Sequence, residues 1–240
     1  MKVLSIGNSF SQDAQRYLHA LCKQNGVPMK AVNLYIGGCS LQMHYLNMLE
    51  RAAAYSYELN GEAIGLKVSI AETLASDTWD VITLQQVSNL SAHYETYTPY
   101  IEALAEHVRT YCPHTKLMIH ETWAYEEGSD RLHTVGGFGT ADDMMLAIRE
   151  AYDIAAKAIS ADGIIPCGDA MLLASKTGVE KVHRDSFHAS LGAGRYLLAL
   201  TWYRALTGRD ISDDTFVPFD APITEAERAA VIAAVNAVTA

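Results

Sequence analysis

The sequence predicts an α/β protein in which a parallel sheet is covered by helices on both faces. Short apolar runs, which are typical of buried strands, alternate along the chain with longer stretches that carry apolar residues at helical spacing. Half of the 240 residues are hydrophobic and 19% are charged, as in ordinary globular proteins. No repeat, low-complexity tract or linker interrupts this alternation, so we predict a single domain over residues 1–240.

Five strands of the sheet follow from the apolar runs, which span residues 3–6, 29–36, 81–84, 116–119 and 163–166. Pro166 places the end of the last run at an edge or at a strand terminus. Residues 53–69 break the helical rhythm: apolar residues alternate on both sides of Asn60-Gly61, a dipeptide that favours a tight turn. We therefore expect a small β-hairpin inserted beside a five-stranded sheet.

Helices are predicted where apolar residues recur every three or four positions. Ser11 is the expected N-cap of the first helix, Asp142 caps a later one, and the last helix opens at Thr224 with the spacing of a capping box. Gly and Pro residues after the first helix prevent its continuation. The predicted helices cover residues 12–23, 41–49, 70–75, 100–111, 142–159, 191–206 and the stretch from 224.

Charge and cysteine usage exclude several classes of function. The net charge of −10 repels nucleic acid and anionic membranes, so neither is an expected partner. No apolar run is long enough to span a bilayer and no signal peptide precedes the first strand, which makes a cytoplasmic protein the default expectation. Four scattered cysteines without a CxxC pair indicate free thiols, and no HxH or HExxH spacing predicts a metal site. The sequence sets no oligomeric state.

Polar residues follow the predicted strands in a way that favours a site. Ser9 comes after the first strand, in the expected loop before the first helix, and Gly37-Gly38 follows the second strand. Gln85-Gln86 follows the third strand. The carboxyl ends of parallel strands meet at one edge of a sheet, where sites form. Taken alone, a serine at this position more often helps to cap the helix than acts as a nucleophile.

Asp185 and His188 add an acid and a base to this edge. Their three-residue spacing can bring the carboxylate onto Nδ1 of the imidazole and leave Nε2 free to face a hydroxyl. An isolated DxxH motif is more often a turn cap beside a surface histidine. Together with Ser9 and the glycine turn, however, it supplies what acyl transfer requires: a nucleophile, a base, an orienting acid and oxyanion donors.

At these residues the chain resembles the SGNH/GDSL hydrolase superfamily. Ile6-Gly7-Asn8-Ser9 is similar to the superfamily's first block, Gly38 to the glycine of its second block, and Asp185-Ser186-Phe187-His188 to its fifth. The chain is similar in particular to an SGNH-like subgroup of unassigned function marked by GNSFS, GGCSL and LQxxS. The resemblance implies a three-layer α/β/α sandwich with a flavodoxin-like five-stranded sheet in the order 2-1-3-4-5, Ser9 as nucleophile, and no cofactor.

The chain departs from the superfamily at the third block, where an asparagine normally completes the oxyanion hole. Here the strand ends in Leu84-Gln85-Gln86, so we expect Gln85 to provide the amide, with Gln86 as the alternative. The backbone N–H groups of Ser9 and Gly38 are the other expected donors.

Further side chains are candidates for substrate binding, each with a structural alternative. His44 could face the site or the surface of its helix, and aromatic residues after the third and fourth strands could form a sugar platform or pack the rim. The candidates are His44, Gln86, Trp123 and Tyr125, together with Tyr94 and Tyr97.

The expected function is that of a serine esterase acting on a small acyl ester, with an acetyl group on a carbohydrate as the leading substrate. Its partner would be a small-molecule or carbohydrate ester. The alternatives are a carbohydrate-binding protein that kept the fold without turnover, and an acyltransferase that uses an acceptor other than water.

Overall fold

The computed structural model describes residues 1–217 and 219–239. Its strands form a seven-stranded mixed sheet in the order β4-β3-β2-β1-β5-β6-β7. The strands β2, β1, β5, β6 and β7 run parallel to one another. The β3–β4 hairpin adds two antiparallel strands beside β2. The strands are β1 (Lys2–Gly7), β2 (Lys30–Tyr35), β3 (Tyr55–Leu59), β4 (Glu62–Val68), β5 (Val81–Leu84), β6 (Lys116–His120) and β7 (Gly163–Ile165).

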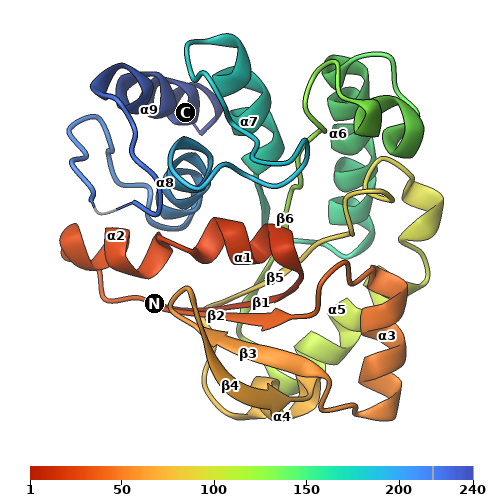
Figure 1. Ribbon diagram of the computed structural model, residues 1–240. Coiled ribbons are helices and arrows are strands. Elements are labelled where there is room, and N and C mark those ends of the chain that lie inside the picture. Colours follow the sequence, from red (N-terminus) through yellow and green to blue (C-terminus); the bar gives the residue numbers. More distant parts are fainter. Residues whose placement is uncertain (218, 240) are drawn as a thin grey trace.

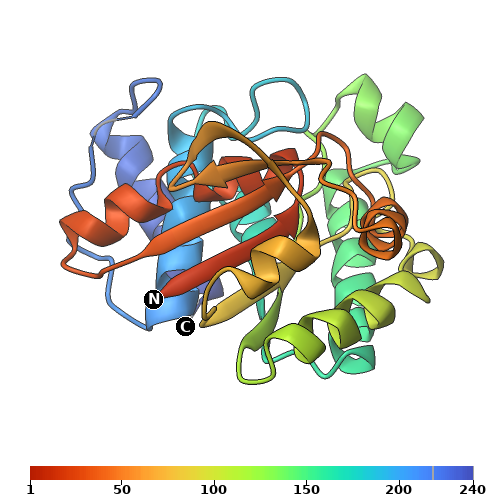
Figure 2. The ribbon, with the colours of Figure 1, turned by 90° about the horizontal axis from the view of Figure 1, so that it is seen from below.

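The helices cover both faces of the sheet, as predicted (Figure 1). They are α1 (Ser9–Gln15), α2 (Leu18–Gln24), α3 (Leu41–Glu50), α4 (Ile70–Ala75), α5 (Tyr100–Tyr111), α6 (Ala141–Ala158), α7 (Cys167–Lys176), α8 (Ala193–Thr207) and α9 (Glu225–Val238), with short turns η1 (Tyr94–Thr96) and η2 (Leu132–Gly136). The view from below shows α4 in front of the strands and α8 behind them (Figure 2).

Strand alternation divides the core into two halves. Val3 of β1 packs with residues of α1, α2, α7, α8 and α9 on one face of the sheet. Its neighbour Leu4 packs with residues of α4, α5 and α6 on the other face. Successive side chains of a strand point to opposite faces of the sheet. A strand with apolar side chains on both faces is therefore buried on both sides. The short apolar runs in the sequence are therefore the parallel strands, of which β7 lies at the edge of the sheet.

The sheet has seven strands rather than the five that we predicted. The hairpin at residues 53–69 forms, but β3 pairs with β2 in antiparallel register, Val32 opposite Leu59 and Tyr35 opposite Ser56. The hairpin thus extends the sheet instead of lying beside it. A parallel β2 would otherwise expose an unpaired edge, and the hairpin covers that edge.

Three further differences concern the helices. The first predicted helix is divided into α1 and α2, and α1 begins at Ser9 with Asn8 as its N-cap, so Ser11 is not the cap. The α6 cap is Thr140, whose hydroxyl accepts from the Asp143 N–H, rather than Asp142. The sequence analysis did not predict α7. At Thr224 the expected capping box is present.

Within residues 1–217 and 219–239, no helix combines the length and the apolar character needed to cross a membrane.

Candidate active site

Ser9 is the first residue of α1, at the carboxyl end of β1. The side chain of Asn8 caps the helix by accepting a hydrogen bond from the Phe10 N–H (3.0 Å), and the Ser11 hydroxyl accepts from the Asn8 N–H (3.0 Å). This reciprocal pair explains why the helix starts two residues before the predicted cap. The first N–H groups of a helix have no partner within it, so the Ser9 N–H points out of the helix end.

Asp185 and His188 lie in the segment between α7 and α8, and they reach Ser9. The His188 Nε2 atom is 2.9 Å from the Ser9 hydroxyl oxygen, and its Nδ1 atom is 2.8 Å from the Asp185 carboxylate. The other carboxylate oxygen accepts from the backbone N–H of His188 (2.9 Å). The structure thus brings together three residues, predicted from the sequence to form one site, that lie near opposite ends of the chain.

The electrostatics of Asp185 favour its ionised form. Partial burial opposes ionisation, but the hydrogen bonds from the side chain and backbone of His188 outweigh it and hold the pKa of Asp185 below its usual value. An ionised Asp185 keeps the Nδ1 proton on His188, which leaves Nε2 as the acceptor that faces Ser9.

Asp13 of α1 holds this segment against the helix. Its carboxylate is completely buried and accepts from Arg184 Nη1 (2.9 and 3.0 Å), from Arg195 Nε (2.8 Å) and from the Ala189 N–H (3.2 Å). Arg184 and Ala189 lie on either side of Asp185 and His188 in the sequence. The helix that begins with Ser9 therefore also anchors the segment that carries Asp185 and His188.

A cavity of about 320 Å³ opens above Ser9. Its walls come from the ends of β1, β2 and β5, from the long segment after β6, and from the segment before α8. Gly38 has a φ of +65°, a left-handed conformation that glycine adopts at little cost and that turns the chain toward the cavity. The lining residues are Asn8, Ser9, Phe10, Tyr35, Gly37, Gly38, Val87, Ser88, Asn89, Arg131, Phe187 and His188.

Neither glutamine that follows β5 lines this cavity, so the structure does not bring the expected amide donor to it. The Gln85 amide donates to Asn8 Oδ1 (2.7 Å), and its oxygen accepts from His120 Nδ1 (2.7 Å). Both glutamines are buried. Gln86 accepts from the backbone N–H groups of Leu41 and Val87, and its amide donates to Thr96. The two side chains hold the loops around the site in place.

The expected substrate-binding residues do not line this cavity either. His44 is buried against the hydroxyl of Tyr55 (2.9 Å), and burial lowers its pKa to about 3. Trp123 is buried and stacks on Phe10 with ring centroids 4.0 Å apart. Trp123 therefore has a packing role, as its structural alternative stated, whereas His44 lies neither at this cavity nor on the surface of its helix.

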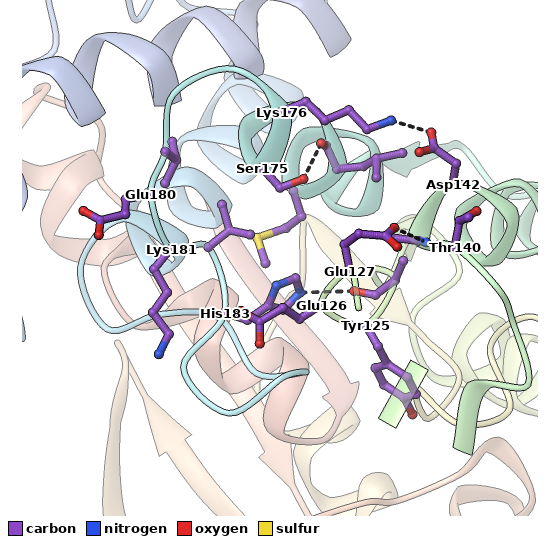
Figure 3. A pocket seen from close by; sticks show the side chains of 16 residues that line it. Tyr125, Glu126, Glu127, Thr140, Asp142, Ser175, Lys176, Glu180, Lys181 and His183 are labelled. Carbon is purple, nitrogen blue, oxygen red and sulfur yellow. Dashed lines mark hydrogen bonds and ion pairs between the residues drawn. The ribbon is translucent and has the colours of Figure 1, made fainter. Parts of the chain in front are cut away.

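Tyr125 borders a second cavity of about 510 Å³, which is shown in Figure 3. Several of its polar side chains are already engaged: Lys176 pairs with Asp142, and Glu127 accepts from the Ala141 N–H. Neither Ser9 nor His188 lines this second cavity. Tyr125 therefore lines the second cavity and not the cavity above Ser9.

Several lining residues, above all Arg131 and Phe187, were not predicted from the sequence. The Arg131 guanidinium carbon lies 3.6 Å from the centroid of the Phe187 ring, which is itself 3.8 Å from the His188 ring. Phe187 lies within the DxxH motif, so its position next to His188 could have been inferred. For Arg131 the sequence offered only the length of its loop, because long loops in compact domains are often functional.

Among the residues that the structure describes, no three His, Cys, Asp or Glu side chains are grouped so that they could hold a metal ion. All four cysteines are buried and unpaired. Burial raises the pKa of Cys22 and Cys39 to about 12, so these thiols carry no nucleophilic thiolate near neutral pH.

Comparison with known proteins places this chain in a family. The model of the family described as "Domain of unknown function (DUF4886)" matches residues 2–240. A crystal structure of a DUF4886 family protein from Bacteroides uniformis is 36% identical, with a TM-score of 0.90, over 99% of this chain and 94% of that one. A search of curated proteins finds no match.

More distant structures share the fold. A protein from Slackia heliotrinireducens described as a "putative SGNH hydrolase" superposes with a TM-score of 0.64 at 22% identity, over 86% of this chain and 98% of that one. An acetylxylan esterase from Geobacillus stearothermophilus does so with a TM-score of 0.53 at 16% identity, over 85% and 92%. The chain therefore belongs to the DUF4886 family and has the fold of the SGNH/GDSL hydrolases.

Proposed function

We propose that this protein is a serine esterase that hydrolyses a small acyl ester, with Ser9, His188 and Asp185 as its catalytic residues. The observation that carries the proposal is the continuous chain of contacts from Ser9 to His188 (2.9 Å) and from His188 to Asp185 (2.8 Å) at the floor of a cavity. These distances lie within hydrogen-bonding range for a nucleophile, a base and an orienting acid. The shared fold with an acetylxylan esterase adds support.

In the proposed reaction the Ser9 oxygen attacks the carbonyl carbon while His188 Nε2 takes the hydroxyl proton. The imidazolium is stabilised by Asp185, and the same proton then passes from Nε2 to the leaving alcohol. Water attacks the acyl-enzyme with His188 again as base, which releases the acid and restores Ser9. The backbone N–H groups of Ser9 and Gly38 stabilise the oxyanion of each tetrahedral intermediate.

The size of the cavity favours a short acyl chain. A volume of about 320 Å³ must hold the acyl group and part of the alcohol. We therefore propose an acetyl ester, with a carbohydrate as the leading class of alcohol. A series of aryl esters should show higher kcat/KM for the acetate than for the octanoate. A maximum at eight carbons would contradict the acetylesterase proposal.

A fluorophosphonate probe tests the nucleophile directly. We expect a covalent adduct that mass mapping places on Ser9, and its loss in Ser9→Ala. His188→Ala should lower the rate of labelling and of aryl acetate hydrolysis by about a thousandfold or more, as in other triads. Ser56→Ala, a half-buried serine of β3, is the matched control and should be labelled normally. Folded wild-type protein that takes no label would favour a binding protein without turnover.

A further inference from the structure

Arg131 is a cation in the wall of the proposed active site that the hydrolytic steps do not use. It lies in the segment between β6 and α6 and lines the same cavity as Ser9 and His188. Its guanidinium stacks on the ring of Phe187 (3.6 Å to the centroid) and lies 5.3 Å from that of Tyr125. Stacking on aromatic faces fixes the plane of a guanidinium and leaves its edge free to donate.

The charge of Arg131 is not balanced by a carboxylate. In residues 1–217 and 219–239, no Asp or Glu oxygen lies within 4.0 Å of its nitrogens, and its Nε atom is buried without a hydrogen-bond partner. Six other arginines in these ranges pair with carboxylates, among them Arg16 with Asp220, Arg149 with Asp169 and Arg195 with Asp13. A partly desolvated cation without a partner is costly, so its position in a cavity indicates that an anion completes it.

The position of Arg131 also identifies which part of the substrate would carry the anion. In the proposed mechanism His188 delivers a proton to the leaving alcohol, so the alcohol lies on the His188 side of Ser9. Phe187 and then Arg131 continue the wall on that same side, with Phe187 and His188 rings 3.8 Å apart. Gly38 and the end of β2 form the opposite side, where the oxyanion would lie.

We propose that Arg131 binds a carboxylate on the alcohol part of the ester, so that the substrate class is an acylated hydroxy acid such as an acetylated sugar acid. The inference rests on the proposed esterase function. The planar guanidinium can donate two parallel hydrogen bonds to one carboxylate. A local cation is needed because the chain as a whole carries a net charge of −10, which repels anionic substrates.

A pair of matched esters tests this in the kinetics. The ratio of kcat/KM for 4-acetoxybenzoate to that for 4-acetoxybenzamide, compared between variants, cancels the intrinsic reactivity of the two esters. In Arg131→Gln the ratio should fall about tenfold to a hundredfold, the usual value of a charge-assisted hydrogen bond. Arg131→Lys should give an intermediate ratio, because the point charge remains while the two-pronged geometry is lost.

Lys116→Gln is the matched control, because it removes one positive charge at the amino end of β6, on the opposite edge of the sheet from Ser9. Its ratio should equal that of the wild type. An Arg131→Gln ratio equal to that of the wild type would overturn the proposal, and so would an equal fall in Lys116→Gln.

A binding experiment separates this proposal from the esterase assignment. In Ser9→Ala protein, which cannot form the acyl-enzyme, calorimetry should show tighter binding of 4-hydroxybenzoate than of 4-hydroxybenzamide. Adding Arg131→Gln should remove that preference. Equal binding of the two compounds in Ser9→Ala protein would refute the role of Arg131 even if Ser9 takes the fluorophosphonate label. Absence of labelling together with a preference that depends on Arg131 would refute only the esterase.

Discussion

At the scale of single residues, Asn8 connects the elements that meet at Ser9. Its side-chain oxygen accepts from Phe10 N–H and from the Gln85 amide, and its own amide donates to the carbonyl of Cys39 (3.1 Å). One buried side chain thereby fixes the start of α1, the loop after β2 and the end of β5. Gln85 acts on the site through Asn8, and a different amide must supply any third oxyanion donor.

We predict that Asn89 supplies this third donor. It follows β5 and lines the cavity, whereas both glutamines point elsewhere. Asn89→Ala should lower kcat for aryl acetates about a hundredfold, the typical cost of one lost oxyanion donor, with an unchanged melting temperature. Gln85→Ala should instead lower the free energy of unfolding by about 1–3 kcal/mol, because it leaves buried partners unpaired. Normal turnover in Asn89→Ala would show that two backbone donors suffice.

The sequence could identify the proposed catalytic residues but not the residues that support them. Ser9, Asp185 and His188 are identifiable because each occurs in a short motif whose spacing follows from local geometry. The direction in which Gln85 points depends on Asn8 and His120, which are 77 and 35 residues away. Arg131 reaches the cavity because of how a long segment folds over Phe187, and no local pattern encodes that path.

At the scale of elements, the short helix α1 both presents Ser9 and anchors the segment that carries Asp185 and His188. Ser9 begins it, and one turn later Asp13 anchors the segment with Asp185 and His188. Gly7 allows α1 to approach β2, since a Cβ there would lie 2.0 Å from the Ser11 oxygen and 3.2 Å from Asn33 Oδ1. The same helix thus positions Ser9 and His188, the proposed nucleophile and base.

We predict that Asp13→Asn impairs both stability and turnover. The substitution removes a buried charge that two arginines share, and about 2–4 kcal/mol of unfolding free energy should be lost. In protein that remains folded, kcat should fall more than KM rises, because the segment with His188 loses its anchor. The control is Asp142→Asn, which breaks an exposed pair with Lys176 and should cost at most about 1 kcal/mol. Equal effects of the two substitutions would contradict the anchoring role.

Most elements could be predicted because their signals are local. Apolar runs mark the parallel strands, and Thr224 with Glu227 marks the start of α9. The pairing of the hairpin with β2 could not be predicted, because it depends on an edge that exists only once the sheet has formed. The break between α1 and α2 has a similar origin: Arg16 binds Asp220 and Tyr17 contacts the Leu191 carbonyl, both far away in the sequence.

At the scale of the whole molecule, buried ionisable groups set how stability depends on pH. Burial lowers the pKa of His44 and His120 to about 3 and that of His183 to about 4. The unfolded chain therefore binds more protons than the folded one between these values and about pH 6.5. Stability from these histidines is complete above about pH 6.5 and is lost as the pH falls.

Glu121 acts in the opposite direction. It follows β6, is buried, and accepts a hydrogen bond from the Asp169 N–H (3.0 Å). Burial, together with the nearby charge of Asp169, raises the pKa of Glu121 to about 8. The folded state therefore holds this proton while the unfolded chain has lost it. The stability that Glu121 contributes is complete below about pH 4.5 and declines as the pH rises toward 8.

We predict that Glu121→Gln removes this decline. Glutamine keeps the oxygen that accepts from Asp169 and cannot ionise, so it resembles the protonated side chain present in the fold. Urea unfolding at pH 5.0 and pH 8.5 should show a variant that matches the wild type at the lower pH. At the higher pH it should exceed the wild type by about 2 kcal/mol or more, since one pKa unit corresponds to about 1.4 kcal/mol. The histidines are unchanged in the variant, so the difference between the two proteins isolates Glu121. A difference that is the same at both pH values would mean that Glu121 is already ionised in the folded protein at pH 5.0.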